Sequence, residues 1–267
     1  MAGTEAIRNI SRWRGGGIEQ FFLTDPIYMQ LDAGVQNQSI NGNTTAWTLF
    51  SVFGRLNYEL ADKYLLEAVI RRDGSSRFGT EGNYGVFPAF SAGWRISNEN
   101  FMSFSEDWLD FMKIRVGYGE TGNDQIGNYN SYTTYTALIG ASPWGGSGSY
   151  YPVTGVNNGP GTPGFKRSAF GNPNVQWETT TTTNLGVDLT ILENFDITVD
   201  LWKRVTDDML YPKQIPFVLG RATAPSINVG KMENTGLDVE LGYSGSSLNN
   251  ELSYNVSLNV SHYQNEI

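Results

Sequence analysis

The sequence predicts an all-β fold: an antiparallel meander that forms part of a transmembrane outer-membrane β-barrel, with about eight strands of a larger barrel in this chain. Two observations carry the prediction. Apolar and polar residues alternate over segments of about ten residues, which is the period of a strand with two different faces. The connections between these segments are alternately short and long, as in outer-membrane barrels, whose turns are short at one end and whose loops are long at the other.

The composition supports a strand-rich fold and excludes several classes of protein. Gly, Asn, Ser and Thr dominate the residues that are neither apolar nor charged, and 13% of the chain is aromatic. This mixture favours strands and turns over helices. A formal net charge of −9 disfavours nucleic acid as a partner, because phosphate binding needs clustered Lys and Arg. The chain has no Cys, so disulfides and thiolate chemistry are excluded.

Residues 1–45 precede the first of the alternating segments and are expected to form an extracellular loop or an irregular lead-in segment, with the partial barrel over 46–267. From Tyr64 onward the alternation is clear, since Leu66 and Ile70 fall on one face and Glu67 and Arg71 on the other. The remaining alternating segments are TLFSVFGRLNYEL (48–60), FPAFSAGWRIS (87–97), MKIRVGYG (112–119), WETTTTTNLGVDLTI (177–191), FDITVDLWKR (195–204), LDVELGY (237–243) and LSYNVSLNV (252–260).

The connections sort into two sets by length. Short links are predicted at 60–63, 97–111, 192–195 and 244–251, and long loops at 72–87, 120–175 and 206–233. Aromatic residues near the predicted strand ends are expected to form interfacial girdles: Tyr58, Tyr64, Trp94, Tyr118, Trp177 and Tyr243. A soluble glycan-binding β-sandwich or jelly-roll module is the alternative, although sandwich strands are usually shorter than these.

A set of motifs between residues 53 and 243 points to one family. The stretches are FGRLNYELADKYLLEAVIRRDGSSRFGTEGNYGVFPAFSAGWRIS (53–97), WLDFMKIRVGYGETGND (108–124), NPNVQWETTTTTNLGVDL (172–189) and MENTGLDVELGY (232–243). In this order they resemble the barrel of the SusC/RagA family of TonB-dependent outer-membrane transporters, while the long loops between them do not match. Such transporters have about 22 strands around a plugged lumen, so the chain resembles a piece of that barrel.

The resemblance implies a function and a set of partners. It implies import of large nutrients, glycans or oligopeptides, across the outer membrane of a Gram-negative, Bacteroidota-like cell. The implied partners are a SusD-like surface lipoprotein, the TonB complex, reached through an N-terminal region that this chain lacks, outer-membrane lipid, and the glycan or peptide substrate. It implies no enzymatic activity and no cofactor.

The charged residues of the alternating segments are predicted to face a solvated lumen and to pair across neighbouring strands. They are Glu67, Arg71, Asp73, Arg95, Lys113, Arg115, Asp188, Asp196, Asp200, Arg204, Asp238 and Glu240.

Motifs that resemble catalytic or cofactor sites have simpler explanations. GYGETG (117–122) fits a dinucleotide-binding pattern, but no helical period follows it. His262 is the single histidine, so a zinc site is not expected. Carboxylate pairs such as Asp207 with Asp208 fall at strand ends, where solvated carboxylates are common.

The predicted long loops carry aromatic residues in a Gly-rich, weakly charged context. Aromatic rings can stack on sugar rings while polar neighbours bind hydroxyls. Contact with the lipoprotein and packing of the loop against itself are the other interpretations. The first candidates for contact with substrate or partner are Trp144, Tyr150, Tyr151 and Tyr211.

Overall fold

The computed structural model describes residues 1–23, 25–137, 150–151, 162–220, 222–247 and 252–267. Nine strands form the main sheet: β1 (Ala2–Phe21), β2 (Gly34–Leu60), β3 (Tyr64–Ser75), β4 (Tyr84–Arg95), β5 (Leu109–Asn123), β10 (Glu178–Ile191), β11 (Phe195–Asp207), β14 (Lys231–Ser247) and β15 (Leu252–Glu266). Short strands lie in the connections: β6 (Thr134–Ala137), β7 (Tyr150–Tyr151), β8 (Thr162–Pro163), β9 (Phe165–Ala169), β12 (Leu210–Pro212) and β13 (Ser226–Asn228). The 3-10 helices are η1 (Pro26–Tyr28), η2 (Ile96–Asn98), η3 (Asn100–Ser105) and η4 (Phe217–Leu219).

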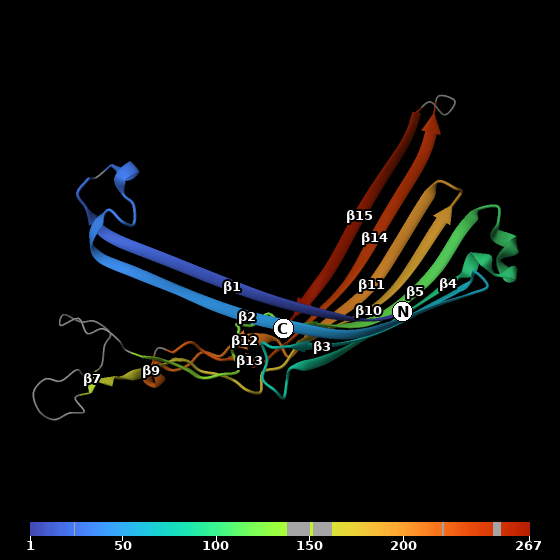
Figure 1. Cartoon of the computed structure of the whole chain (residues 1–267). Helices are drawn as coiled ribbons and strands as arrows, with labels where there is room; N and C mark the ends of the chain where they lie inside the picture. Colours follow the sequence, from blue (N-terminus) through green and yellow to red (C-terminus); the bar gives the residue numbers. More distant parts are fainter. Residues whose placement is uncertain (24, 138–149, 152–161, 221, 248–251) are drawn as a thin grey trace, which may run out of the picture.

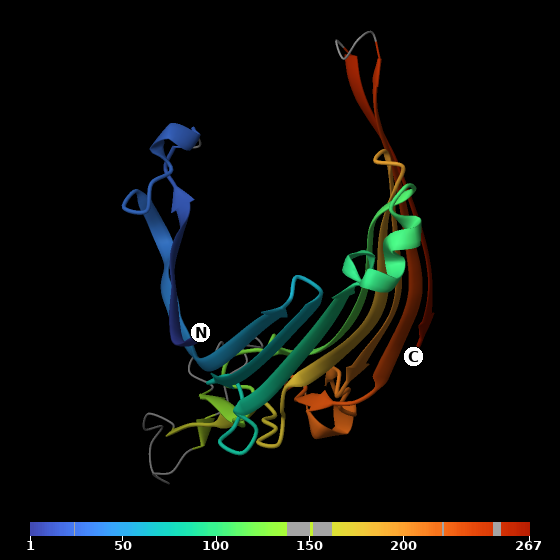
Figure 2. The same ribbon diagram turned by 90° about the vertical axis from the view of Figure 1, so that its right-hand side faces the viewer.

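The nine long strands follow one another in the sheet in chain order, and each pairs antiparallel with its neighbours. The predicted antiparallel meander is therefore confirmed. Figures 1 and 2 show one curved, open sheet that runs as an arc from β1 and β2 to β14 and β15. The other sheets among the described residues are two-stranded and lie in the long connections. None of the helices in the described ranges is long and apolar enough to cross a membrane.

The first 45 residues differ from the expectation of a loop or irregular lead-in. β1 pairs with β2 from Ala2 opposite Gly54 to Phe21 opposite Gly34, so the sheet has nine strands and not eight. The alternation is hidden in the sequence because Arg8 and Arg12 share a face of β1 with Ile10. Backbone pairing with β2 forms this strand without a clean hydrophobic pattern. In Figure 1 the β1–β2 hairpin projects beyond the other strands of the main sheet.

The strand register brings the apolar positions into continuous rows on one face. One row runs from β3 to β15 through Leu66, Ala92, Val116, Leu185, Leu201, Leu237 and His262. Leu66, Ile70 and Phe90 are more than half exposed. Trp94 is also exposed, and Val187 and Leu189 on the same face are partly exposed. In the described residues no second layer covers this face, as the second sheet of a sandwich would.

The apolar face is a band that slopes across the sheet. On β3, going toward the long loops, the first polar residue on this face is Arg72. It lies six residues beyond Leu66, the β3 member of the row described above. On β11 the first polar residue is Lys203, two residues beyond Leu201, and on β15 it is His262, within the row itself. The edge thus shifts by six residues over the six strand steps from β3 to β15. Such a shift is what tilted, staggered strands of a barrel require if the band is to stay level.

The connections sort to the two ends of the sheet as predicted. The turns after β2 and β10 are tight, with positive φ at Ala61 and Asp62 and at Leu192 and Glu193, as in two-residue hairpin turns. These turns and the 96–108 connection stand at one end in Figure 1, and the long loops stand at the other. Because the strands alternate in direction, this separation follows from the topology.

The long loops pack into a small core at their end of the sheet. Phe78, Phe87, Val175 and Trp177 are each less than a tenth exposed, and the Trp177 ring lies 5.1 Å from Phe78 and 5.3 Å from Phe87. Trp177 also donates a hydrogen bond to the Asn83 carbonyl at 3.3 Å. Its predicted place in an interfacial girdle is therefore wrong: the residue precedes β10, and its ring is buried against Phe78 of the β3–β4 loop and Phe87 of β4.

Polar contacts extend this loop core. Arg77 forms an ion pair with Asp124 at 3.4 Å and lies over the Trp47 ring, which joins three separate stretches of the chain. Further along, the Asn172 amide donates to the Ser226 carbonyl at 2.9 Å. The described parts of the long loops therefore form one cross-linked layer.

At the opposite end, Glu99 joins two short connections. Its carboxylate accepts hydrogen bonds from Tyr64 Oη at 2.7 Å, Lys63 Nζ at 2.9 Å and Trp94 Nε1 at 3.1 Å. Lys63 ends the β2–β3 turn, whereas Glu99 lies in the β4–β5 connection. The three donors, that of Tyr64 foremost, lower the pKa of Glu99 to about 2 from its ordinary value of 4.5.

Replacing Trp177 by Ala should loosen the long loops and leave the strands intact. Removal of a buried Trp costs about 3–5 kcal/mol, and the loss falls on the loop core that the ring fills. Hydrogen exchange of the full-length protein should become faster over residues 162–177 and 208–220 but not over β11. Trp177→Phe, which keeps a ring, serves as the control with a smaller effect. Unchanged loop exchange in the Ala variant would contradict the packing described above.

Replacing Glu99 by Gln should change how stability depends on pH. Because the folded pKa of Glu99 lies below the unfolded value, its stabilisation is present above pH 4.5 and is lost as the pH falls from 4.5 toward 2. The variant should be less stable than the natural protein at neutral pH, and the difference should shrink over that interval. Denaturant midpoints measured between pH 2 and pH 7 test this. A difference that stays constant over the interval would show that the charge of Glu99 does not contribute.

Candidate functional site: the polar face of the sheet

The face opposite the apolar band carries the charged residues that the sequence analysis assigned to a lumen. Strand parity and register place all twelve on this one face: Glu67, Arg71, Asp73, Arg95, Lys113, Arg115, Asp188, Asp196, Asp200, Arg204, Asp238 and Glu240. For example, Lys113 lies opposite Asp188, which in turn lies opposite Thr198. The set therefore shares one surface, although its members are spread over six strands.

Arg115 is the centre of the largest charge network on this face. Its Nε and Nη2 atoms bind the two carboxylate oxygens of Asp188, each at 2.8 Å, and Nη2 also binds Asp200 at 3.1 Å. Lys113 adds a longer contact to Asp188 at 3.6 Å. A bidentate arginine–carboxylate pair fixes the orientation of both groups. These bonds link strands β5, β10 and β11.

Gly186 makes this network possible. It lies on β10 directly between Arg115 and Asp200 in the register. A Cβ atom at this position would stand 2.4 Å from Asp200 Oδ1 and 2.8 Å from Arg115 Cζ. The guanidinium therefore crosses β10 over a residue that has no side chain, and reaches a carboxylate two strands away.

A second network surrounds Arg71 near the long-loop end. Arg71 binds Asp73 at 2.7 Å, Ser51 at 2.8 Å and Glu5 at 2.8 Å. Glu5 belongs to β1, so this network also spans three strands. The sequence analysis missed Glu5 because it treated the first 45 residues as a lead-in. It missed Ser51, which is fully buried, because a serine on a strand carries no signal of its own.

Two further ion pairs lie closer to the short-turn end. Arg55 binds Glu67 at 2.9 Å, and Arg95 binds Glu59 at 2.9 Å. Arg95 also contacts Asp62 in the β2–β3 turn. The cations of β2–β5 on this face thus each meet a carboxylate.

The β11–β14 part of the face is more acidic. Asp200 and Asp238 are direct cross-strand partners. Arg115 holds the first of them, and Trp202 Nε1 donates to the second at 2.8 Å. A separate hydrogen-bond donor for each carboxylate limits the repulsion between like charges on neighbouring strands. Asp196 accepts a bond from Thr190 at 2.8 Å, and Arg204 lies 5.8 Å from the centre of the Trp202 ring.

The described residues hold no arrangement typical of catalysis or metal binding. No group of three or more His, Cys, Asp or Glu side chains in these ranges could hold a metal ion. His262 lies in the apolar row opposite Leu237. Asp207 forms an ion pair with Lys231 at 3.2 Å, while Asp208 accepts a bond from Gln176 at 3.3 Å. The glycines of GYGETG lie within β5, so they do not open a helix.

The structure describes only some of the four aromatic residues predicted in the long loops. Tyr211 lies in β12 and is 55% exposed. Tyr150 and Tyr151 form β7, but their side chains fall outside the described part of the chain, as does all of Trp144. The contact of these four residues with substrate or partner therefore stays a prediction.

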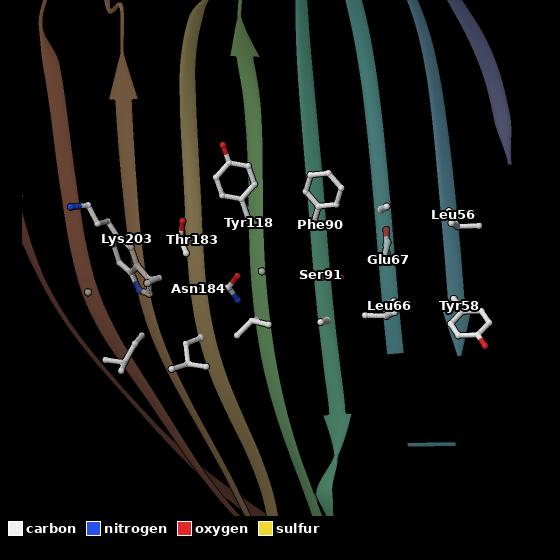
Figure 3. Close-up of a pocket in the computed structure, with 18 of the residues that line it drawn as sticks. Leu56, Tyr58, Leu66, Glu67, Phe90, Ser91, Tyr118, Thr183, Asn184 and Lys203 are labelled. Atoms are coloured by element: carbon white, nitrogen blue, oxygen red, sulfur yellow. The ribbon is translucent and has the colours of Figure 1, made fainter. Parts of the chain in front are cut away.

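A hollow of about 1210 Å³ lies on the apolar side of the sheet (Figure 3). Phe90 and Tyr118, cross-strand partners on β4 and β5, stand at one level of it, with Leu66 and Tyr58 at another. Ala68 and Ala92 also line the hollow, and their small side chains leave it open beside these larger residues. Its lining is almost entirely apolar, and few fixed polar groups are available to orient a hydrophilic ligand.

Comparison with known proteins places this geometry in a family. The family described as "TonB dependent receptor-like, beta-barrel" matches residues 8–266. The chain is 34% identical to TonB-dependent receptor P39 of Formosa agariphila over 90% of its length, and 33% identical to TonB-dependent receptor SusC of Bacteroides thetaiotaomicron over 88%. In both comparisons the match covers 22% of the relative, so the chain spans about a fifth of these proteins.

Among solved structures, the chain resembles the RagAB peptide importer in its open-open state. The TM-score is 0.81 with 25% sequence identity, over 99% of this chain and 27% of that one. The resemblance read from the motifs between residues 53 and 243 is thus confirmed. The match over residues 8–266, together with the nine-stranded meander, shows that this chain belongs to the TonB-dependent receptor-like β-barrel family and forms part of such a barrel.

Proposed function

We propose that these nine strands form part of the wall of an outer-membrane transporter that imports large nutrients with a SusD-like surface lipoprotein. One observation carries the proposal: the same strands present an exposed apolar band on one face and a cross-linked charged surface on the other. In a membrane barrel the apolar band meets lipid and the polar face lines a solvated interior. The charged residues named above are then lumen residues.

The exposure of the apolar band favours lipid over a soluble environment. Soluble monomers rarely expose contiguous apolar surface on this scale, and here it crosses eight strands from β2 to β15. The hollow between Phe90 and Leu66 belongs to this band, so lipid acyl chains are its expected occupant. A glycan-binding sandwich would need a second sheet over the band.

The polar face is suited to the passage of a solute and not to catalysis. Most of its cations are bound to carboxylates on the same or neighbouring strands, which fixes the charges against a wet interior. No activated nucleophile or acid–base pair stands among the described groups, so the chain is proposed to have no enzymatic role. Coupling to the TonB complex would run through parts of the transporter outside this chain.

The substrate class is proposed from the relatives. The RagAB structure is described as a peptide importer, so oligopeptides are one proposed substrate. Glycans, which the resemblance of the sequence motifs implies, are the other. The long-loop end is the proposed outer face, because loops are long on that side of outer-membrane barrels. Substrate and lipoprotein would meet the loops there, with Trp144, Tyr150, Tyr151 and Tyr211 as the proposed contacts.

The assignment of the two faces can be tested with neighbouring residues of β4. Ser91 lies on the polar face and Ala92 on the apolar face. In the full-length transporter in its membrane, Ser91→Cys should react with a charged, water-soluble thiol reagent, whereas Ala92→Cys should not. A lipid-dissolved maleimide should give the opposite ranking. The same ranking with both reagents would refute the membrane wall, and a reversed ranking would invert the faces.

The loop assignment can be tested by alanine replacement. Substituting Trp144, Tyr150, Tyr151 and Tyr211 should weaken substrate uptake or lipoprotein capture while barrel assembly stays normal, because Tyr211 at least is exposed and lies outside the sheet. Tyr211→Phe, which keeps the ring, is the matched control. Truncating an aromatic residue that contributes to an interface costs more than about 1 kcal/mol, which corresponds to at least about a fivefold weaker affinity. Unchanged uptake and capture in the fourfold variant would remove these residues from the proposed site.

A further inference from the structure

The β4–β5 connection exposes large aromatic side chains outside the strands. In the segment 96–108, Phe101 is 59% exposed and Phe104 is 74% exposed. Both belong to η3, which stands at the short-turn end of the sheet in Figures 1 and 2. The other described turns at this end carry fewer exposed aromatic residues: LADK (60–63) has none, and LENF (192–195) has only Phe195, the first residue of β11, which is 45% exposed. The exposure therefore needs its own explanation.

The geometry of η3 gathers these side chains on one side. In a 3-10 helix residues three apart lie directly above one another, so Phe101 and Phe104 share a face. Met102 and Ser105, also three apart, share another face, and Ser105 is 2% exposed with its hydroxyl bonded to the Met102 carbonyl at 2.7 Å. The helix thus turns one side toward the protein and a side with two phenyl rings away from it.

This aromatic side continues the apolar band of the sheet. The Phe101 ring packs edge-on against Trp94 at 6.4 Å, and Trp94 stacks on Tyr64 at 6.5 Å. Trp94 and Tyr64 are the last band residues of β4 and β3 before the short turns. The two rings on η3 therefore extend the band past the ends of the strands, over the connection itself.

Glu99 fits the boundary between lipid and water. Tyr64, Lys63 and Trp94 satisfy its carboxylate, so a charged group stands at this level with little need of water. Tyr and Trp with the polar end bonded and the ring against apolar surface are typical of the headgroup level. Lys63 places a cation at the same level.

We infer that η3 is an interfacial membrane anchor, whose Phe101 and Phe104 rings insert among the lipids at the headgroup–acyl boundary of the leaflet on the short-turn side. A turn of this kind would hold the barrel at a set depth, as amphipathic interfacial helices do by burying an apolar face in this boundary. The occupant is lipid because the surface is continuous with the lipid-facing band. The inference rests on the barrel fold and on the outward orientation of its apolar face, and it does not depend on the substrate.

A pair of labelling sites on the same helix tests the inference. In full-length transporter that has no other accessible cysteine, Phe104→Cys and Ser103→Cys are each labelled with a small fluorophore and reconstituted in phospholipid vesicles. Ser103 is exposed but lies on a different side of η3, so it is the matched control. A phospholipid with a nitroxide near its headgroup should quench the label at 104 several-fold more than the label at 103. Aqueous iodide should show the reverse order.

Phe101→Cys provides a second site on the same face and should follow Phe104→Cys. Equal quenching of positions 103 and 104 by both agents, or stronger iodide quenching at 104, would overturn the anchor. The face test on Ser91 and Ala92 is separate: if it succeeds and the anchor test fails, the barrel assignment stands and only the role of η3 is lost.

Discussion

A strand register that is continuous over the central part of the sheet is the constraint on which the rest of this structure depends. Side chains alternate between two faces, so a slip of one residue would move every apolar residue of a strand into the polar face and every charge into the band. Among the main-sheet pairings of the described residues the register shifts at two places, between Gly17 and Glu19 and between Thr190 and Ile191, and both lie near strand ends. The central pairings carry both the apolar rows and the charge networks without interruption.

The polar face shows how charges stabilise such a register. Exposed ion pairs add little on their own. Arg115 and Arg71, however, each bind side chains on two other strands through several hydrogen bonds. Each network fits only one alignment of three strands. The geometry at Gly186 adds a steric condition, because Arg115 can cross β10 only where no side chain stands. The charges thus select the register more than they strengthen it.

Sequence reasoning recovered the fold where alternation was clean and failed where other forces decide. The faces of β3 followed directly from Leu66 and Glu67, and loop lengths gave the two ends of the sheet. β1 was missed because Arg8 and Arg12 interrupt its apolar pattern, and pairing with β2 depends on backbone bonds that composition does not reveal. Trp177 was misplaced because a strand-end aromatic and a loop-core aromatic look alike in sequence. The partners of Arg115 could be guessed as carboxylates, but only the register identifies Asp188 and Asp200.

The slope of the apolar band has a consequence for exchanging strands between barrels. Its edge shifts by six residues over the six steps from β3 to β15, although Thr183, Lys203 and Thr235 on β10, β11 and β14 stand at one level. The strands therefore carry a position in the stagger as well as two faces. A segment such as β10–β11 moved into a barrel of different tilt would keep its pairing but bring Lys203 to the wrong depth. Chimeric barrels built from this chain should therefore retain the stagger of the donor, or shift the transplanted strands in steps of two residues so that their faces are preserved.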